Sequence, residues 1–141
     1  MIVSKKISFD AAHYLPYYDG KCSRLHGHTW KVELALEGPV DKDTGMVIDF
    51  TWIKKVLETE VTKRFDHKCL NDILPNPTAE NIVIYLYDKI RNEWIQGPDE
   101  EVQVAYVRVW ETENSMVEYR GNPPIDPGLL STIRKYGVIE R

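Results

Sequence analysis

Apolar and polar residues alternate with a period of two in two N-terminal stretches, which predicts two β-strands. Successive side chains of a strand point to opposite faces, so alternation places one face in a core. In residues 2–13 one parity holds Val3, Ile7, Phe9, Ala11 and His13. In residues 28–37 one parity holds His28, Trp30, Val32, Leu34 and Leu36. Residues 14–25 form a polar loop between the two strands.

Two later stretches carry apolar residues at helical spacing. Asp49 is a good N-cap and precedes a predicted helix over 50–64. Thr78 follows Asn76-Pro77 and can cap a second helix over 79–94, before the break at Gly97-Pro98. The apolar stripes consist of Trp52, Ile53, Val56, Leu57 and Val61 in the first helix and of Ile82, Leu86 and Ile90 in the second.

The chain then returns to strand-like composition. Residues 101–111 carry apolar side chains of both parities, which predicts a strand that is covered on both faces. Residues 115–120 predict a last strand, with Asn114-Ser115 as the hairpin turn. The order ββααββ indicates an α+β fold in which helices pack on one face of an antiparallel sheet. Residues 121–141 open with three prolines and predict a C-terminal extension with a short helix over 128–136.

Length and charge narrow the function classes. A chain of 141 residues is long enough for one domain with a proper core, here residues 1–120. The net charge of −4 argues against a nucleic-acid partner held by bulk electrostatics. No apolar run approaches the roughly 18 residues that span a membrane, and the N-terminus reads as a strand. Two cysteines could form one disulfide, but free thiols in a cytoplasmic protein fit better.

Three of the four histidines stand at the predicted strand ends: His13, His26 and His28. Both imidazoles of an H-x-H pair in extended backbone share one face. If the two strands pair as an antiparallel hairpin, His13 lies across from His26. Three histidines without a fourth protein ligand leave one open position, which is typical of a catalytic zinc site. Cys22, four residues before His26, places a thiol close to that metal. An H-G-H pair by itself also occurs in loops without a metal.

Five motifs, in order along the chain, resemble the 6-pyruvoyltetrahydropterin synthase superfamily. The resemblance covers about residues 1–120 and is closest to the 6-carboxytetrahydropterin synthase branch of queuosine biosynthesis. H-G-H alone is weakly specific, whereas the five motifs together are strongly specific. The motifs are F-D-A-A-H-Y-L (9–15), C-S-R-L-H-G-H (22–28), D-H-K-C-L-N-D (66–72), N-P-T-A-E-N (76–81) and W-E-T (110–112).

The resemblance implies a tunnelling fold (T-fold), a four-stranded antiparallel sheet with two helices on one face. It also implies a homo-oligomer, either a trimer whose sheets close into a barrel or a hexamer of two stacked trimers. Closure removes the exposed sheet edges that invite aggregation. Active sites in the superfamily lie between subunits.

The resemblance also assigns roles to individual residues. It implies that His13, His26 and His28 bind Zn²⁺, whose open position takes substrate oxygens. Cys22 matches the catalytic cysteine, whose thiolate acts as a general base. Asp66 and His67 match a proton-relay pair that an adjacent subunit supplies, and histidine exchanges protons near neutral pH.

Glu111 matches the residue that anchors the pterin ring, because a carboxylate can accept two hydrogen bonds from the ring's amino edge. Thr112 is expected to assist it through its hydroxyl or backbone. Glu80 reads as a carboxylate that favours the first turn of its helix, and Cys69 reads as a packing residue. The candidates for binding a triphosphate are Lys21, Arg24, Lys68 and Arg120.

The implied activity is that of a lyase acting on 7,8-dihydroneopterin triphosphate. The products are 6-carboxy-5,6,7,8-tetrahydropterin, triphosphate and acetaldehyde. The alternative enzyme is 6-pyruvoyltetrahydropterin synthase, but the three residues between Cys22 and His26 resemble the queuosine branch. The cysteine argues against a folate-type relative, which has a glutamate in that role. A pterin- or purine-binding protein without activity, or a structural zinc module, stays open as a different class.

Overall fold

The fold is built on a single five-stranded sheet. The computed structural model describes residues 1–95 and 101–121. The strands follow the order β3-β1-β2-β4-β5, and neighbours pair antiparallel except for β3, which runs parallel to β1. Their bounds are β1 (Ile2–His13), β2 (His26–Glu37), β3 (Lys68–Cys69), β4 (Gln103–Thr112) and β5 (Ser115–Tyr119).

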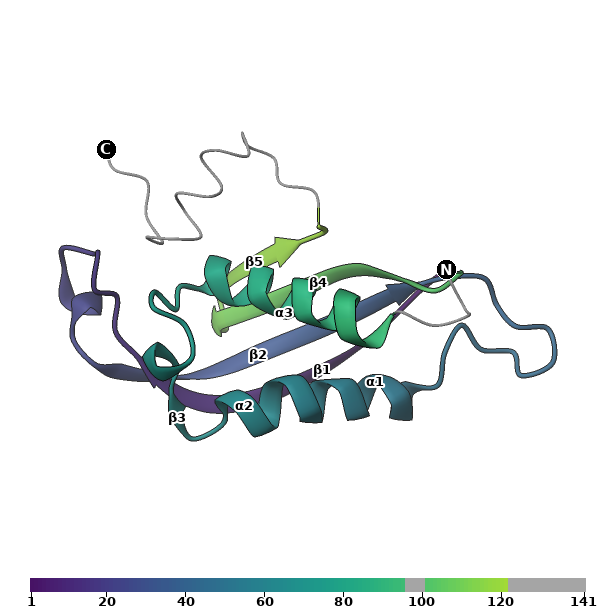
Figure 1. Ribbon diagram of the computed structural model, residues 1–141, viewed down its shortest axis with the longest axis horizontal. Helices are drawn as coiled ribbons and strands as arrows, with labels where there is room; N and C mark the ends of the chain where they lie inside the picture. The colour runs from purple at the N-terminus through teal and green to yellow at the C-terminus, as the bar shows by residue number, and fades with distance from the viewer. Residues whose placement is uncertain (96–100, 122–141) are drawn as a thin grey trace.

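Two helical segments lie side by side on one face of the sheet (Figure 1). The first consists of α1 (Phe50–Leu57), a π-helical turn (Glu58–Thr62) and α2 (Lys63–Phe65), and the second is α3 (Ala79–Trp94). The predicted caps are present. The Asp49 carboxylate accepts a hydrogen bond from the Thr51 amide, and the Thr78 hydroxyl accepts one from the Asn81 amide. Each cap satisfies an amide that has no partner within its helix.

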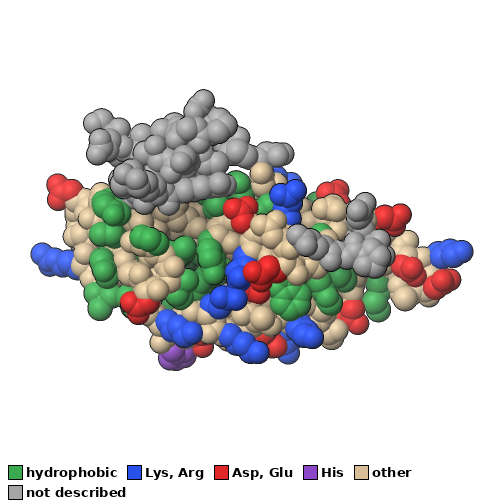
Figure 2. All heavy atoms as spheres, in the orientation of Figure 1, with side chains coloured by type: hydrophobic (Ala, Val, Ile, Leu, Met, Phe, Trp, Pro, Cys, Tyr) green, Lys and Arg blue, Asp and Glu red, His purple; other side chains and the backbone are tan. Residues whose placement is uncertain are grey.

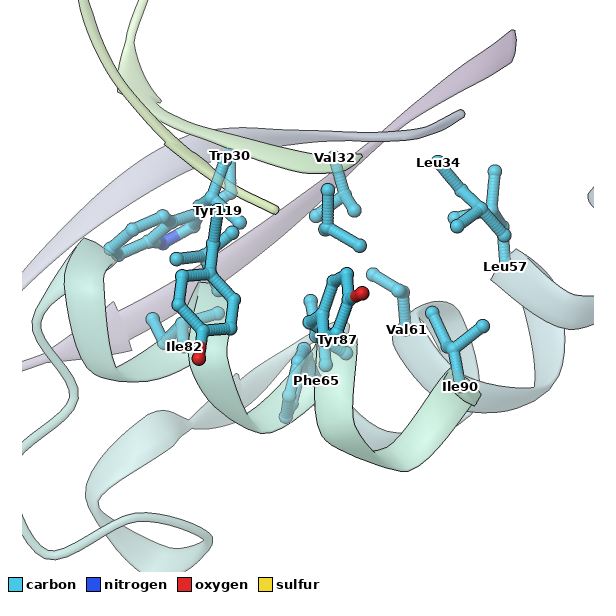
Figure 3. Packing of buried hydrophobic residues seen from close by; sticks show 14 of the residues in the cluster. Trp30, Val32, Leu34, Leu57, Val61, Phe65, Ile82, Tyr87, Ile90 and Tyr119 are labelled. Carbon is cyan, nitrogen blue, oxygen red and sulfur yellow. The ribbon is translucent and has the colours of Figure 1, made fainter. Parts of the chain in front are cut away.

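The core lies between the sheet and the helices (Figure 3). The predicted stripes of both helices are buried, apart from Trp52, which is half-buried. Removing side chains of this size from water stabilises the fold by roughly 1.5–3 kcal/mol each. The residues that β2 and the helices bring together include Trp30, Val32, Leu34, Leu57, Val61, Phe65, Ile82 and Ile90.

The sheet has one strand more than the four predicted. β3 contributes only two residue pairs to the sheet, Ala11↔Lys68 and Ala12↔Cys69. A two-residue strand has no measurable periodicity, so the hydrophobic pattern could not reveal it. The hairpin turn is also displaced by one residue. Thr112 pairs with Ser115, so the turn consists of residues 113 and 114.

Both faces of β4 are covered, as its composition predicts. Its valines face the helices, whereas Tyr106 and Trp110 lie on the opposite face of the sheet. There the Arg108 guanidinium stacks 4.1 Å from the centre of the Tyr106 ring, and Lys6 Nζ lies 4.2 Å from that of Trp110. Long cationic side chains cover aromatic surface in this way because their stems are apolar and their charge attracts the ring face.

A buried carboxylate accompanies the π-helical turn. The Glu60 side chain is 3% exposed. Its two oxygens accept hydrogen bonds from Arg64 Nε and Trp94 Nε1, each at 2.9 Å. Because Trp94 belongs to α3, this carboxylate ties the two helical segments together. The periodicity of the sequence predicts a helix here but not the π-turn.

No helix within residues 1–95 and 101–121 is long and apolar enough to cross a bilayer. On the face that carries the helices, acidic and basic side chains are interspersed rather than separated by sign (Figure 2). The predicted break at Gly97-Pro98, the short helix over 128–136 and the extension of 121–141 beyond Gly121 lie outside the described residues.

Candidate active site and metal centre

The pairing of β1 with β2 brings the three histidines together. His13 pairs with His26, and Ala11 pairs with His28, so the predicted hairpin register is correct. The ring centres of His13 and His26 lie 4.7 Å apart, and those of His26 and His28 lie 4.8 Å apart. The loop of residues 14–25 projects from this end of the hairpin (Figure 1).

Backbone carbonyls orient two of the imidazoles. His13 Nδ1 lies 2.8 Å from the Pro77 carbonyl oxygen, and His26 Nδ1 lies 2.7 Å from that of Arg24. A carbonyl only accepts hydrogen bonds, so each Nδ1 must carry the proton. In the neutral rings each Nε2 therefore holds a lone pair, as a metal ligand requires. Neither carbonyl could be assigned from sequence, because backbone groups leave no signature in it.

The donor atoms of His13 and His26 have nearly the spacing of two ligands in a tetrahedral metal site. Nε2 of His13 and of His26 lie 3.1 Å apart, although two lone pairs cannot form a hydrogen bond with each other. His28 Nε2 is buried and makes no hydrogen bond. Bonds of about 2.0–2.1 Å in a tetrahedral zinc site separate neighbouring donor atoms by about 3.3 Å. The spacing and the unused lone pairs are those of a cation site.

Glu111 is a fourth group that could hold the metal, contrary to the expectation that no such protein ligand is near. Its Oε1 lies 3.2 Å from His28 Nε2. One ligand atom from each of His13, His26, His28 and Glu111 lies within 4.8 Å of the others. The pairing Lys31↔Trp110 in β2 and β4 places Glu111 beside the histidines. The sequence could not reveal this, because β4 is far from both histidine-bearing strands along the chain.

Trp30 forms an apolar wall of the cluster. Its ring centre lies 5.0 Å from that of His13 and 5.5 Å from that of His28. His13 is fully buried. Desolvation lowers the pKa of both His13 and His28, and the charge of Glu111 opposes this in part. Burial therefore favours the neutral form of both rings, which is the form that binds a metal.

This burial predicts that the metal-free protein loses stability as the pH falls. Below about pH 6.5 the unfolded chain takes up protons that the folded His13 and His28 resist, so protonation favours unfolding. Above that pH their contribution is fully present. We expect the urea midpoint of EDTA-treated protein to fall between about pH 7.5 and pH 5.5. A His13→Gln variant should show a shallower fall, and an unchanged wild-type midpoint would contradict the prediction.

Cys22 lies in a short 3-10 helix (Lys21–Ser23) within the projecting loop. Its side chain is a free, half-buried thiol, and its carbonyl accepts a hydrogen bond from the Leu15 amide at 2.9 Å. Cys69 is also a free, half-buried thiol, and it lies in β3. The two cysteines do not form a disulfide with each other in this structure.

Asp66 and His67 form a contacting pair at the start of β3. The Asp66 carboxylate lies 2.9 Å from His67 Nδ1 and accepts a hydrogen bond from the Asp10 amide at 3.0 Å. The Asp10 amide, followed by His67, lowers the pKa of Asp66. His67 has a positive φ of 59°, which is uncommon for a residue other than glycine. Its side chain is 79% exposed and borders an open hollow of about 640 Å³ that His28 also borders.

Three of the remaining candidates make contacts within the subunit, and two are exposed. The Thr112 hydroxyl accepts a hydrogen bond from the Asn114 amide within the β4–β5 turn. Lys68 donates to the Lys63 carbonyl, and Arg120 pairs with Glu118. Lys21 and Arg24 lie exposed on the loop that carries Cys22.

Known proteins are similar to this chain in sequence and in fold. Residues 2–122 match the family described as 6-pyruvoyl tetrahydropterin synthase. A putative 6-carboxy-5,6,7,8-tetrahydropterin synthase of Archaeoglobus fulgidus is 38% identical over 120 residues, which cover 85% of this chain and 96% of that protein. A dihydroneopterin monophosphate aldolase of Pyrococcus furiosus is 38% identical over 113 residues, covering 80% and 91%.

The solved structure of Caenorhabditis elegans 6-pyruvoyl tetrahydropterin synthase is similar to this chain with a TM-score of 0.75 at 27% identity, covering 86% of this chain and 96% of that one. The predicted α+β tunnelling fold is thereby confirmed, with β3 as an addition to the sheet. The family match spans most of the chain and includes all four residues of the cluster described above. The chain belongs to the 6-pyruvoyl tetrahydropterin synthase family and is an enzyme of its lyase class.

Proposed function

We propose that this enzyme is a zinc-dependent 6-carboxy-5,6,7,8-tetrahydropterin synthase that serves queuosine (7-deazapurine) biosynthesis. It converts 7,8-dihydroneopterin triphosphate and water to 6-carboxytetrahydropterin, triphosphate and acetaldehyde. The observation that carries the proposal is the cluster of three imidazoles, two of them oriented by backbone carbonyls, next to the loop that holds Cys22. The spacing of Cys22 from H-G-H and the similarity to the Archaeoglobus fulgidus protein support the carboxy product.

His13, His26 and His28 hold the zinc ion in this proposal. When bound, zinc supplies Lewis acidity, which makes C–H bonds beside a substrate oxygen more acidic. The Pro77 and Arg24 carbonyls keep two of the rings in the metal-binding tautomer. The Trp30 wall limits water at the cluster, and electrostatic interactions are stronger where water is excluded.

Cys22 accepts a proton from the carbon side arm of the substrate and returns it at a neighbouring atom. Asp66 holds His67 through their 2.9 Å contact, and His67 passes protons between the substrate and solvent. Triphosphate leaves by elimination. Hydrolytic cleavage of a carbon–carbon bond in the same side arm, which consumes one water molecule, then releases acetaldehyde and leaves the carboxyl group on the ring. Lys21 and Arg24, which are exposed on the Cys22 loop, are the cations we assign to the triphosphate.

Glu111 anchors the pterin ring rather than the metal. An ionised carboxylate accepts two parallel hydrogen bonds from an amino group and a neighbouring ring N–H, the pattern that a pterin presents. Thr112, the next residue, assists from the end of β4 through its hydroxyl or backbone. With Glu111 on the substrate, the histidines leave the open metal position that catalysis needs.

Product analysis tests this function. Zinc-loaded protein is incubated with 7,8-dihydroneopterin triphosphate, and pterins are identified by mass spectrometry while acetaldehyde is followed in parallel. We expect 6-carboxytetrahydropterin and acetaldehyde in equal amounts. A 6-pyruvoyl product without acetaldehyde would assign the alternative enzyme. Turnover of dihydroneopterin monophosphate alone would assign an aldolase, and no turnover of either substrate would leave a pterin- or purine-binding protein.

We further propose a homo-oligomer, a trimer or a hexamer of two trimers, in the cytoplasm. Both edge strands of the sheet, β3 and β5, are short and offer backbone groups to a neighbour. The two free thiols suit a reducing compartment. In this assembly Asp66 and His67 act in the site of an adjacent subunit.

Mixing two inactive variants tests this sharing of residues between subunits. Cys22→Ala and His67→Asn proteins are unfolded, combined and refolded with zinc. His67→Asn is preferred to alanine because asparagine tolerates the positive φ at this position. If the two residues act across subunits, random mixing restores activity at about a quarter of the sites. If both act within one subunit, the mixture stays inactive.

A further inference from the structure

Within one subunit, the loop that carries Cys22 is not held by apolar packing. None of residues 14–25 is buried, and only Leu15 and Cys22 are half-buried. Tyr14, Tyr17, Tyr18 and Leu25 are exposed large side chains. The position of such a segment depends on hydrogen bonds, because it buries too little surface to offset the entropy of ordering it.

The side-chain amide of Asn71 makes two hydrogen bonds to the first residue of this loop. Its Oδ1 accepts from the Tyr14 amide at 2.9 Å, and its Nδ2 donates to the Tyr14 carbonyl at 2.8 Å. The pair Ala12↔Cys69 is the last of the parallel pairing between β1 and β3. Asn71 and Tyr14 each lie two residues further on. The Asn71 side chain thus acts like a peptide group that continues the pairing beyond the end of the sheet.

One further hydrogen bond joins the residue after Tyr14 to the cysteine. Leu15, which follows Tyr14, donates its amide to the Cys22 carbonyl at 2.9 Å. Two hydrogen-bonded contacts, from Asn71 to Tyr14 and from Leu15 to Cys22, therefore link Asn71 to the backbone of Cys22. This link does not pass through His26 or His28, which are held in β2.

Asn71 itself has a rigid base. It lies in a 3-10 helix (Leu70–Asp72) whose first residue, Leu70, is fully buried in the core. The Leu70 carbonyl accepts hydrogen bonds from the amides of Ile73 and Leu74 at 3.0 and 2.9 Å. Because Leu70 is fixed in the core, the neighbouring Asn71 side chain can hold the loop in a defined position relative to the core.

We propose that Asn71 is a positioning residue that sets where the Cys22 thiol lies relative to the three histidines. Its importance for turnover rests on the function proposed for Cys22. The effect of Asn71 on the position of the thiol does not depend on that function, and it can be measured separately. Asn71 touches neither the histidines nor the proposed substrate groups.

The test compares Asn71→Asp with Asn71→Ala in a Cys69→Ser background, where Cys22 is the only thiol and the serine hydroxyl can replace the donor that Cys69 Sγ gives to Asn71 Oδ1. Aspartate keeps an oxygen for the Tyr14 amide but loses the donor to the Tyr14 carbonyl, whereas alanine loses both hydrogen bonds. Asn92→Asp on the exposed surface of α3 makes the same change of charge as a matched control. For each zinc-loaded protein we would measure the rate of Cys22 alkylation by iodoacetamide, zinc per subunit, kcat and KM, with melting temperature as a check of folding.

We expect both Asn71 variants to alkylate several-fold faster than the background protein and to lose about 10- to 100-fold in kcat, because small misplacements of a reacting group are costly. Zinc per subunit should not change. Alkylation equal to that of Asn92→Asp would overturn the proposal. Loss of zinc would also overturn it, because Asn71 would then support the metal centre. Faster alkylation with unchanged turnover would uphold the positioning and contradict the function proposed for Cys22.

Discussion

Replacing Cys22 with alanine is expected to lower kcat by about 10²–10⁴-fold, the usual contribution of a general base. This corresponds to roughly 3–5 kcal/mol of transition-state stabilisation. The metal content should stay at the wild-type level, since the three histidines come from β1 and β2 and not from the loop. Product formation under saturating substrate, together with zinc per subunit, measures both expectations.

Cys69→Ser is the matched control for this experiment. It removes the only other thiol, which is also free and half-buried. We expect little change in kcat, because Cys69 has no assigned chemistry and serine can replace the donor that Cys69 Sγ gives to Asn71 Oδ1. If Cys22→Ala retains wild-type turnover, the proton transfer belongs to another group and the proposed mechanism is wrong. If it loses zinc as well as activity, Cys22 is a metal ligand.

Replacing Glu111 with glutamine is expected to reduce kcat/KM by about 10²-fold while zinc remains bound. Glutamine keeps the size of the side chain but replaces one acceptor oxygen with an NH₂ donor, which faces the donors of the pterin edge. Losing a charge-assisted hydrogen bond and leaving a donor unpaired costs about 3 kcal/mol, or about 10²-fold. Steady-state kinetics and metal analysis of the same preparation test this.

The comparison with His28→Ala decides whether Glu111 binds substrate or metal. His28 Nε2 and Glu111 Oε1 lie 3.2 Å apart, so either atom could face the ion. His28→Ala should lose most of its zinc, because two imidazoles hold the ion far more weakly than three. If Glu111→Gln loses zinc to the same extent, four protein groups close the site. A closed tetrahedral site is typical of a structural zinc and would argue against catalysis at the metal.

The elements of this fold could largely be predicted from sequence because their signals are local. A strand and a helix differ in the period of their apolar residues, and β1, β2 and α3 each carry enough periods to be recognised. The three histidines follow from the same reasoning. His26 and His28 share a face because strands have a period of two, and His13 follows from the hairpin.

Only the tertiary structure decided what surrounds the histidines. Glu111 reaches the cluster through the pairing of β2 with β4, and Pro77 supplies its carbonyl from the loop before α3. Contacts between segments so far apart in sequence depend on how the sheet and helices pack. β3 and the two hydrogen bonds of Asn71 to Tyr14 are also products of packing, since two paired residues and one amide leave no periodic pattern. The sequence thus determined the ligands by type and spacing, and the fold decided which groups orient them.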